Sequence, residues 1–95
     1  MHVITRKRIQ EFIAQHPDSQ SSLESWYRIM AHTDYNSFNE LKRHFASADY
    51  VNNLVVFNIS GNKYRLIAAI HFNRKKVFIR EILTHAEYDK SKWRQ

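Results

Sequence analysis

Four side chains in the last third of the chain have the chemistry needed to act on a phosphate: Arg65, Arg80, His85 and Tyr88. A guanidinium stays charged and grips phosphate through two parallel hydrogen bonds. An imidazole titrates near neutrality and can serve as acid or base. A phenol can stack on a nucleobase or join a proton transfer. The set fits cleavage of RNA by its own 2′-hydroxyl, which needs a proton acceptor, stabilisation of the dianionic phosphorane and a proton donor, but no metal ion.

Positive charge is concentrated in the same region. The chain has 95 residues and a net charge of +6, and residues 63–95 carry nine Lys/Arg against three Asp/Glu, which accounts for the whole excess. A basic surface attracts polyanions through long-range steering and counterion release. A basic face that only aids solubility is the alternative. Under the polyanion interpretation, further RNA or phosphate contacts are expected from a group of basic side chains: Lys63, Arg74, Lys75, Lys76 and Lys90.

Composition excludes several other classes of protein. Cysteine is absent, and the histidines show neither H-x-H nor H-E-x-x-H spacing, so neither a disulfide framework nor a zinc site is expected. No apolar run approaches the roughly 20 residues that a membrane span needs. We therefore expect one globular domain over residues 1–95, without metal, cofactor or membrane contact, acting in the cytoplasm.

The first half of the sequence has helical periodicity. Apolar residues at i, i+3 and i+4 begin at Ile9 and stop at His16-Pro17, where proline disfavours a helical residue before it. A second stripe follows a predicted capping box of Ser21 with Glu24: Leu23, Trp26, Tyr27 and Met30, ending near Thr33-Asp34. A short third helix is predicted after Ser37, whose partner in a second capping box is Glu40; its apolar side is Phe38, Leu41 and Phe45.

The second half changes to strand periodicity. Strands are predicted over 54–59, 64–72 and 77–83, separated by a turn at 60–62 and a basic loop at 73–76. Thr84 and Glu87 form a capping box that opens a short helix from His85 to about Lys90. The predicted fold is α+β: N-terminal helices packed on an antiparallel β-meander, with a short C-terminal helix.

Alternation along the second strand places its functional residues on one face. The apolar set is expected to face the helices: Tyr64, Leu66, Ala68, Ile70 and Phe72. A two-residue turn at Gly61-Asn62 would pair Asn58 with Arg65. A four-residue loop at 73–76 would pair Phe72 with Val77, and hence Arg65 with Thr84, Ile67 with Ile82, and Ala69 with Arg80. Arg80 would then share the face of Arg65, and Glu81 would point to the opposite face. Under these assumptions one end of the sheet gathers the candidate residues: Lys63, Arg65, Arg80, His85 and Tyr88.

Two segments together resemble a known family. The stretch VVFNISGNKYRLIAAI (55–70), followed by VFIREILTHAEYDK (77–90), is similar to the HigB-type toxins of bacterial toxin–antitoxin systems, within the RelE-like superfamily. The upstream stretches 16–30 and 38–51 resemble the same family. The resemblance implies a RelE-like α+β fold and a ribosome-dependent endonuclease that cuts translated mRNA in the ribosomal A site. It also implies a HigA-like helix-turn-helix antitoxin, through which the pair contacts operator DNA.

The resemblance also implies roles for individual residues. Arg65 matches the second-strand arginine that binds the scissile phosphate, Arg80 the third-strand arginine and Tyr88 the C-terminal aromatic residue. His85 resembles the acid/base histidine of some relatives, and Lys63 takes the part of a phosphate-binding lysine. The identity of the general base stays open. Two other functions remain alternatives: a non-catalytic RNA- or ribosome-binding module, and an antitoxin-bound transcriptional corepressor.

Overall fold

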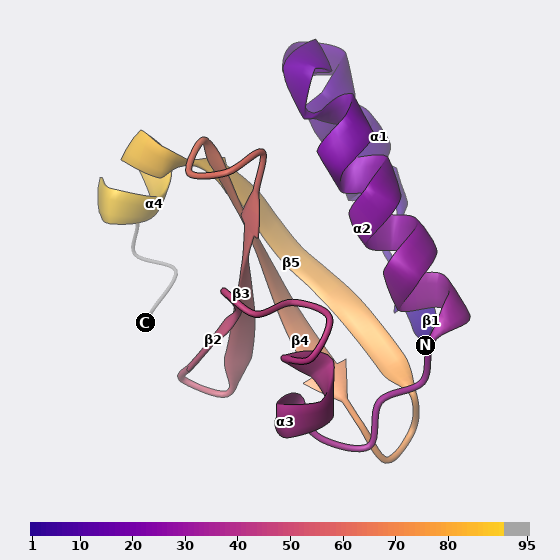
Figure 1. The fold of residues 1–95 in the computed structure, drawn as a ribbon. Helices are drawn as coiled ribbons and strands as arrows, with labels where there is room; N and C mark the ends of the chain where they lie inside the picture. The colour runs from indigo at the N-terminus through magenta and orange to yellow at the C-terminus, as the bar shows by residue number, and fades with distance from the viewer. Residues whose placement is uncertain (91–95) are drawn as a thin grey trace.

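The computed structural model describes residues 1–90. Its strands are β1 (His2–Ile4), β2 (Asp49–Val51), β3 (Leu54–Ile59), β4 (Tyr64–His71) and β5 (Lys76–Thr84). Its helices are α1 (Lys7–Gln15), α2 (Gln20–His32), α3 (Phe38–Leu41) and α4 (His85–Lys90), with one 3-10 turn, η1 (Pro17–Ser19). Figure 1 shows α1 and α2 side by side next to β5, and α4 at the end of the sheet farthest from the N-terminus.

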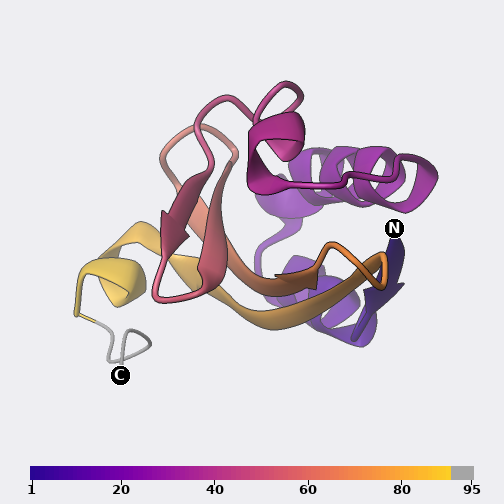
Figure 2. The same ribbon diagram turned by 90° about the horizontal axis from the view of Figure 1, so that it is seen from below.

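Within residues 1–90 the strands form one mixed sheet in the order β1-β5-β4-β3-β2, in which only the β1–β5 pair is parallel. The sheet is strongly curved, with α1 and α2 on one side and α4 on the other (Figure 2). This arrangement confirms the predicted α+β fold with helices covering an antiparallel meander. Among residues 1–90, none of the helices has the length and apolar character to cross a membrane.

The core lies between α1, α2 and one face of the sheet. The inward residues of β4 are those predicted: Tyr64, Leu66 and Ala68 are buried in the core, and Ile70 packs against it, as does Phe72 just after the strand. The helical stripe supplies the other half, with Leu23 and Met30 fully buried and Trp26 meeting Phe57 edge-to-face at 5.4 Å between ring centroids. The apolar face of the strand and the apolar stripe of the helix therefore pack against each other, as their two-residue and 3.6-residue periods predicted.

The start of α2 differs from the prediction. Pro17 begins η1, which runs directly into α2, so the helix starts at Gln20 and Ser21 lies inside its first turn. The predicted Ser21–Glu24 capping box is therefore wrong. Ser19, the residue at the N-cap, has helical backbone angles, and its hydroxyl donates to the carbonyl of His16 at 2.6 Å. The box predicted for the third helix is present in part, since Ser37 Oγ accepts from the backbone N–H of Glu40.

Two strands were not predicted from the sequence. β1 and β2 are three residues each, too short to show an alternating pattern. β2 joins β3 through Asn52-Asn53, with φ of 51° and 65°, and the pairing of Val51 with Leu54 makes this a two-residue hairpin. Asparagine tolerates the left-handed region, and such turns match the twist of the strands. The Asn-Asn pair was thus an available signal for β2.

The pairing of β4 with its neighbours is partly as predicted. Asn58 pairs with Arg65, as the Gly61-Asn62 turn required. On the other side, His71 pairs with Lys76 and Arg65 with Leu83, so the pairings predicted from the loop 73–76 are wrong. The four-residue connection lies one position earlier in the chain than assumed. A bulge in β5 then adds a residue between Ile79, opposite Ala68, and Glu81, opposite Ile67; the extra residue is Arg80.

Candidate active site

Arg65 lies near the start of β4, the central strand of the sheet, with only 9% of its surface exposed. Its Nη1 donates to the carbonyl of Tyr64 at 3.0 Å, and its guanidinium lies 5.5 Å from the ring centroid of Tyr88. In residues 1–90, the ion pairs do not include Arg65. Burying a cation without a carboxylate partner is costly. The arrangement leaves a guanidinium whose charge is not neutralised within the described chain.

Tyr88 reaches Arg65 because α4 begins immediately after β5. The N–H of Thr84 donates to Glu87 Oε1 at 2.9 Å, and the N–H of Glu87 donates to Thr84 Oγ1 at 3.1 Å. This is the reciprocal capping box predicted from the sequence. The backbone N–H of His85 also donates to the carbonyl of Lys63 at 2.9 Å, which ties the start of α4 to the entry of β4. The capping box and the hydrogen bond from His85 to Lys63 together hold the helix that carries Tyr88 in place.

The bulge changes which residues share the face of Arg65. We call this side of the sheet, opposite α1 and α2, the outer face. Arg80 follows the buried Ile79, so strand alternation puts it on the outer face as predicted, and it is exposed. Glu81 pairs with Ile67, which lies two residues from Arg65 on the same face. The expectation that Glu81 points away from Arg80 is therefore wrong, because the bulge adds one residue to the alternation.

His85 is half exposed at the first position of α4. Its Nδ1 lies 3.0 Å from Asp89 Oδ2, one helical turn later. A carboxylate at Nδ1 favours the tautomer with a proton on that nitrogen, which leaves Nε2 to exchange protons. The carboxylate also offsets the unfavourable helix dipole at this end of α4. The i, i+4 spacing of His85 and Asp89 was the sequence signal for this pair.

Lys63 is directed away from the other candidates, toward η1. Its Nζ lies 3.1 Å from Asp18 Oδ2, and the hydroxyl of Tyr64 donates to Asp18 Oδ1 at 2.6 Å. The Tyr64 hydrogen bond, followed by that of Lys63, lowers the pKa of Asp18 below its ordinary value of 3.8, and the Asp18 bond raises the pKa of Tyr64 above 10.0. No local pattern could have indicated this contact, because Asp18 and Tyr64 lie far apart in the sequence.

The remaining predicted contacts are dispersed. The β4–β5 connection holds Arg74 and Lys75 and lies at the end of β4 opposite Arg65. Arg74 and Lys76 are exposed. Lys75 turns to the helical side, where its Nζ donates to the carbonyl of Tyr35 at 3.1 Å and to Asn36 Oδ1 at 2.6 Å. Lys90 is exposed at the end of α4.

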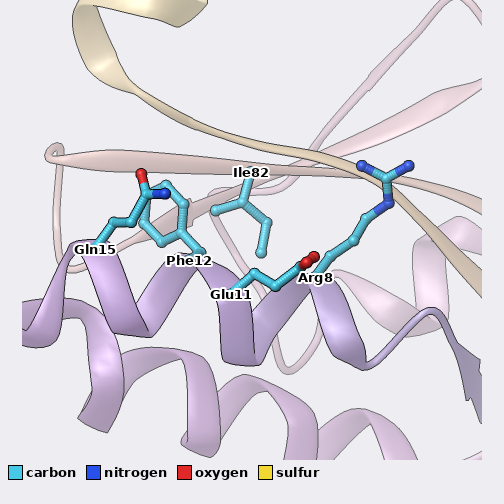
Figure 3. A pocket seen from close by; sticks show the side chains of 5 residues that line it. All are labelled: Arg8, Glu11, Phe12, Gln15 and Ile82. Atoms are coloured by element: carbon cyan, nitrogen blue, oxygen red, sulfur yellow. The ribbon is translucent and has the colours of Figure 1, made fainter.

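A hollow between α1 and β5 lies outside this site. It encloses about 190 Å³ and is lined by Arg8, Glu11, Phe12, Gln15 and Ile82. Figure 3 shows the side chains of α1 beneath the sheet, and Ile82, which belongs to β5, pointing down between them. Ile82 packs against the core, on the opposite face from Arg65. The described residues contain no group of three or more His, Asp or Glu side chains placed to hold a metal ion.

Comparison with known proteins identifies the family of the chain. Residues 19–91 match the family model of the HigB toxin, described as the RelE-like toxic component of a toxin–antitoxin system. The chain is 36% identical over 93 residues to the mRNA interferase HigB of Escherichia coli O6:H1, a match that covers 95% of this chain and 90% of that protein. It is 34% identical over 92 residues to the mRNA interferase toxin HigB of Escherichia coli K12, covering 94% and 88%. The same identity and coverage hold for the mRNA interferase HigB of Shigella flexneri. The chain therefore belongs to the HigB toxin family.

Proposed function

We propose that this chain is a toxin that cuts translated mRNA in the ribosomal A site, through attack of the RNA 2′-hydroxyl and without a metal ion. Its relatives are named mRNA interferases. The observation that carries the proposal is the buried guanidinium of Arg65, which has no acid partner in the described chain and lies beside the Tyr88 ring. A phosphodiester is the group that would neutralise this cation while the ring contacts an adjacent base.

The proposed roles follow from charge and position. Arg65 binds the scissile phosphate and stabilises the dianionic phosphorane, with Arg80 supplying a second positive charge on the outer face. His85, through Nε2, transfers a proton, and Tyr88 stacks on the base beside the cut or donates to the leaving 5′-oxygen. Lys63 contacts phosphate after leaving Asp18, which is feasible because exposed ion pairs contribute little. Arg74, Lys75, Lys76 and Lys90 are proposed to contact RNA away from the cut.

Partners are proposed on the same basis. The family description names a toxin–antitoxin system, and we propose a HigA-like antitoxin with a helix-turn-helix domain as the partner. The complex would contact operator DNA through that antitoxin. The site of action would be the cytoplasm, where messages are translated.

Two features of the product test the mechanism. The purified chain is added to a translation reaction and to the same message without ribosomes, and the ends of the fragments are identified. Attack by the 2′-hydroxyl forms a 2′,3′-cyclic phosphate and releases a 5′-hydroxyl, whereas attack by a metal-activated water leaves different ends. We expect cyclic phosphates, and only with ribosomes. Binding to ribosomes without any cleavage would instead favour a non-catalytic module.

A further inference from the structure

A row of three basic side chains crosses the sheet at the end remote from Tyr88. His2 of β1 pairs with Lys76 of β5, and Lys76 pairs with His71 of β4, so the three residues lie side by side on neighbouring strands. All three are exposed, and Arg74 is exposed in the connection beside them. We call these four residues the tip patch.

The three strand residues of the tip patch belong to the outer face. The next residues in two of its strands, Val3 and Val77, point into the core, so His2 and Lys76 point to the other side. His71 contacts the ring of Phe78 edge-to-face at 5.2 Å. Phe78 in turn pairs with Ala69. Arg65 lies six positions before His71 in β4, about 20 Å at the rise of a strand. Between these two ends, the outer face holds the buried Ile67 and the half-buried Ala69 on β4, and the exposed Glu81 and Arg80 followed by Phe78 on β5.

Stability of the sheet does not explain this row. The residues directly opposite Lys76 on the two neighbouring strands are His2 and His71, so Lys76 forms no stabilising cross-strand pair with a carboxylate there. Lysine often protects an edge strand from aggregation, but β5 is an inner strand covered by β1. In residues 1–90, the ion pairs include none of the four tip-patch residues. By contrast, Lys75 next to them turns to the helical side and bonds Tyr35 and Asn36.

We propose that the tip patch is a second RNA-binding site, which holds the phosphodiester backbone of a strand that runs along the outer face from Arg65. The inference rests on the proposed function, since it extends the same RNA along the same face. Arg74 and Lys76, which take part in none of the ion pairs within residues 1–90, supply charge for the phosphates, and the ring of Phe78 offers a surface for a base. The RNA is the message, because the strand that continues from Arg65 is the one whose phosphate Arg65 binds.

Binding of a non-cleavable RNA tests the patch independently of catalysis. The probes are a labelled single-stranded RNA with 2′-O-methyl riboses and, separately, ribosomes without message. The double variant Arg74→Gln/Lys76→Gln is compared with Lys7→Gln/Arg28→Gln, which removes the same charge from exposed residues of α1 and α2. The charge-retaining pair Arg74→Lys/Lys76→Arg, with melting temperatures of all variants, controls for folding.

We expect the tip variant to bind several-fold more weakly than the control pair. The slope of log affinity against log salt should flatten by about 1.4, or about 0.7 for each lost phosphate contact. Weaker binding of the tip variant to the oligonucleotide supports the proposal, whereas weaker binding to ribosomes alone would overturn it and assign the patch to ribosomal RNA. Equal loss in both double variants, or no binding of either probe by the unmodified chain, would overturn the proposal. A chain that binds through the patch but cuts nothing would refute the nuclease function and leave the patch intact.

Discussion

Removal of the Thr84 hydroxyl should weaken the docking of Tyr88 against Arg65 without unfolding the sheet. α4 has six residues, far fewer than a helix needs for stability on its own, so its cap and its contacts with the sheet hold it in place. In Thr84→Ala the N–H of Glu87 loses its 3.1 Å acceptor, whereas the bond from the Thr84 N–H to Glu87 stays possible. Loss of such a cap costs about 1 kcal/mol. This corresponds to about a five-fold shift toward the undocked helix.

Hydrogen exchange and cleavage together measure this effect. In Thr84→Ala, amides of residues 85–90 should exchange about five-fold faster, while those of β3 and β4 change little. Cleavage efficiency should fall by much less than five-fold, because a five-fold rise in a small undocked fraction takes little from the docked population that cuts. Thr84→Ser keeps the hydroxyl and Glu87→Gln keeps an acceptor, so both should behave nearly like the unmodified chain. The reasoning is refuted if residues 85–90 of Thr84→Ala exchange at the same rate as those of Thr84→Ser.

Three further predictions concern the fold. Leu66→Ala should lower the free energy of unfolding by about 2–5 kcal/mol in urea titrations, because Leu66 is fully buried, whereas the exposed Tyr50→Ala should change it by less than about 0.5 kcal/mol. Asp18 has a pKa below its ordinary value of 3.8, so its contribution to stability is present above that value and is lost as pH falls through the folded pKa. Asp18→Asn should therefore flatten the acid side of a plot of melting temperature against pH. An unchanged acid side would contradict the lowered pKa of Asp18. Asn53 has a φ of 65°, so Asn53→Val should cost about 1 kcal/mol in thermal melts while Asn53→Gly should not destabilise.

Elements with long periodic patterns were predictable from the sequence. α1 ends at the proline signal, and α4 has the bounds that its capping box indicated. The inward face of β4 also follows from simple alternation. These features depend on neighbours within a few positions along the chain, so the local sequence is sufficient to predict them.

Features that depend on one-residue offsets or on distant contacts were not predictable. The β4–β5 connection has four residues in either register, so composition could not decide between pairing at Phe72 and at His71. The bulge at Arg80 has no glycine or proline to mark it, yet it brings Glu81 to the face of Arg65. The contact of Asp18 with Lys63 and Tyr64 depends on how η1 meets the sheet, which only the folded chain defines.

The central claim is that the Arg65 guanidinium binds the RNA phosphate at the cut. It is tested most directly by inducing the unmodified chain, Arg65→Ala and Arg28→Ala in bacterial cells, and mapping new RNA 5′ ends together with growth. Arg28 is an exposed arginine of α2 and serves as the matched control, and circular dichroism of each purified variant verifies folding. We predict that the unmodified chain and Arg28→Ala arrest growth and cut translated messages, while a folded Arg65→Ala does neither. Cleavage by Arg65→Ala at the level of the unmodified chain, or whole transcripts in all three cultures with expression verified, would contradict the claim.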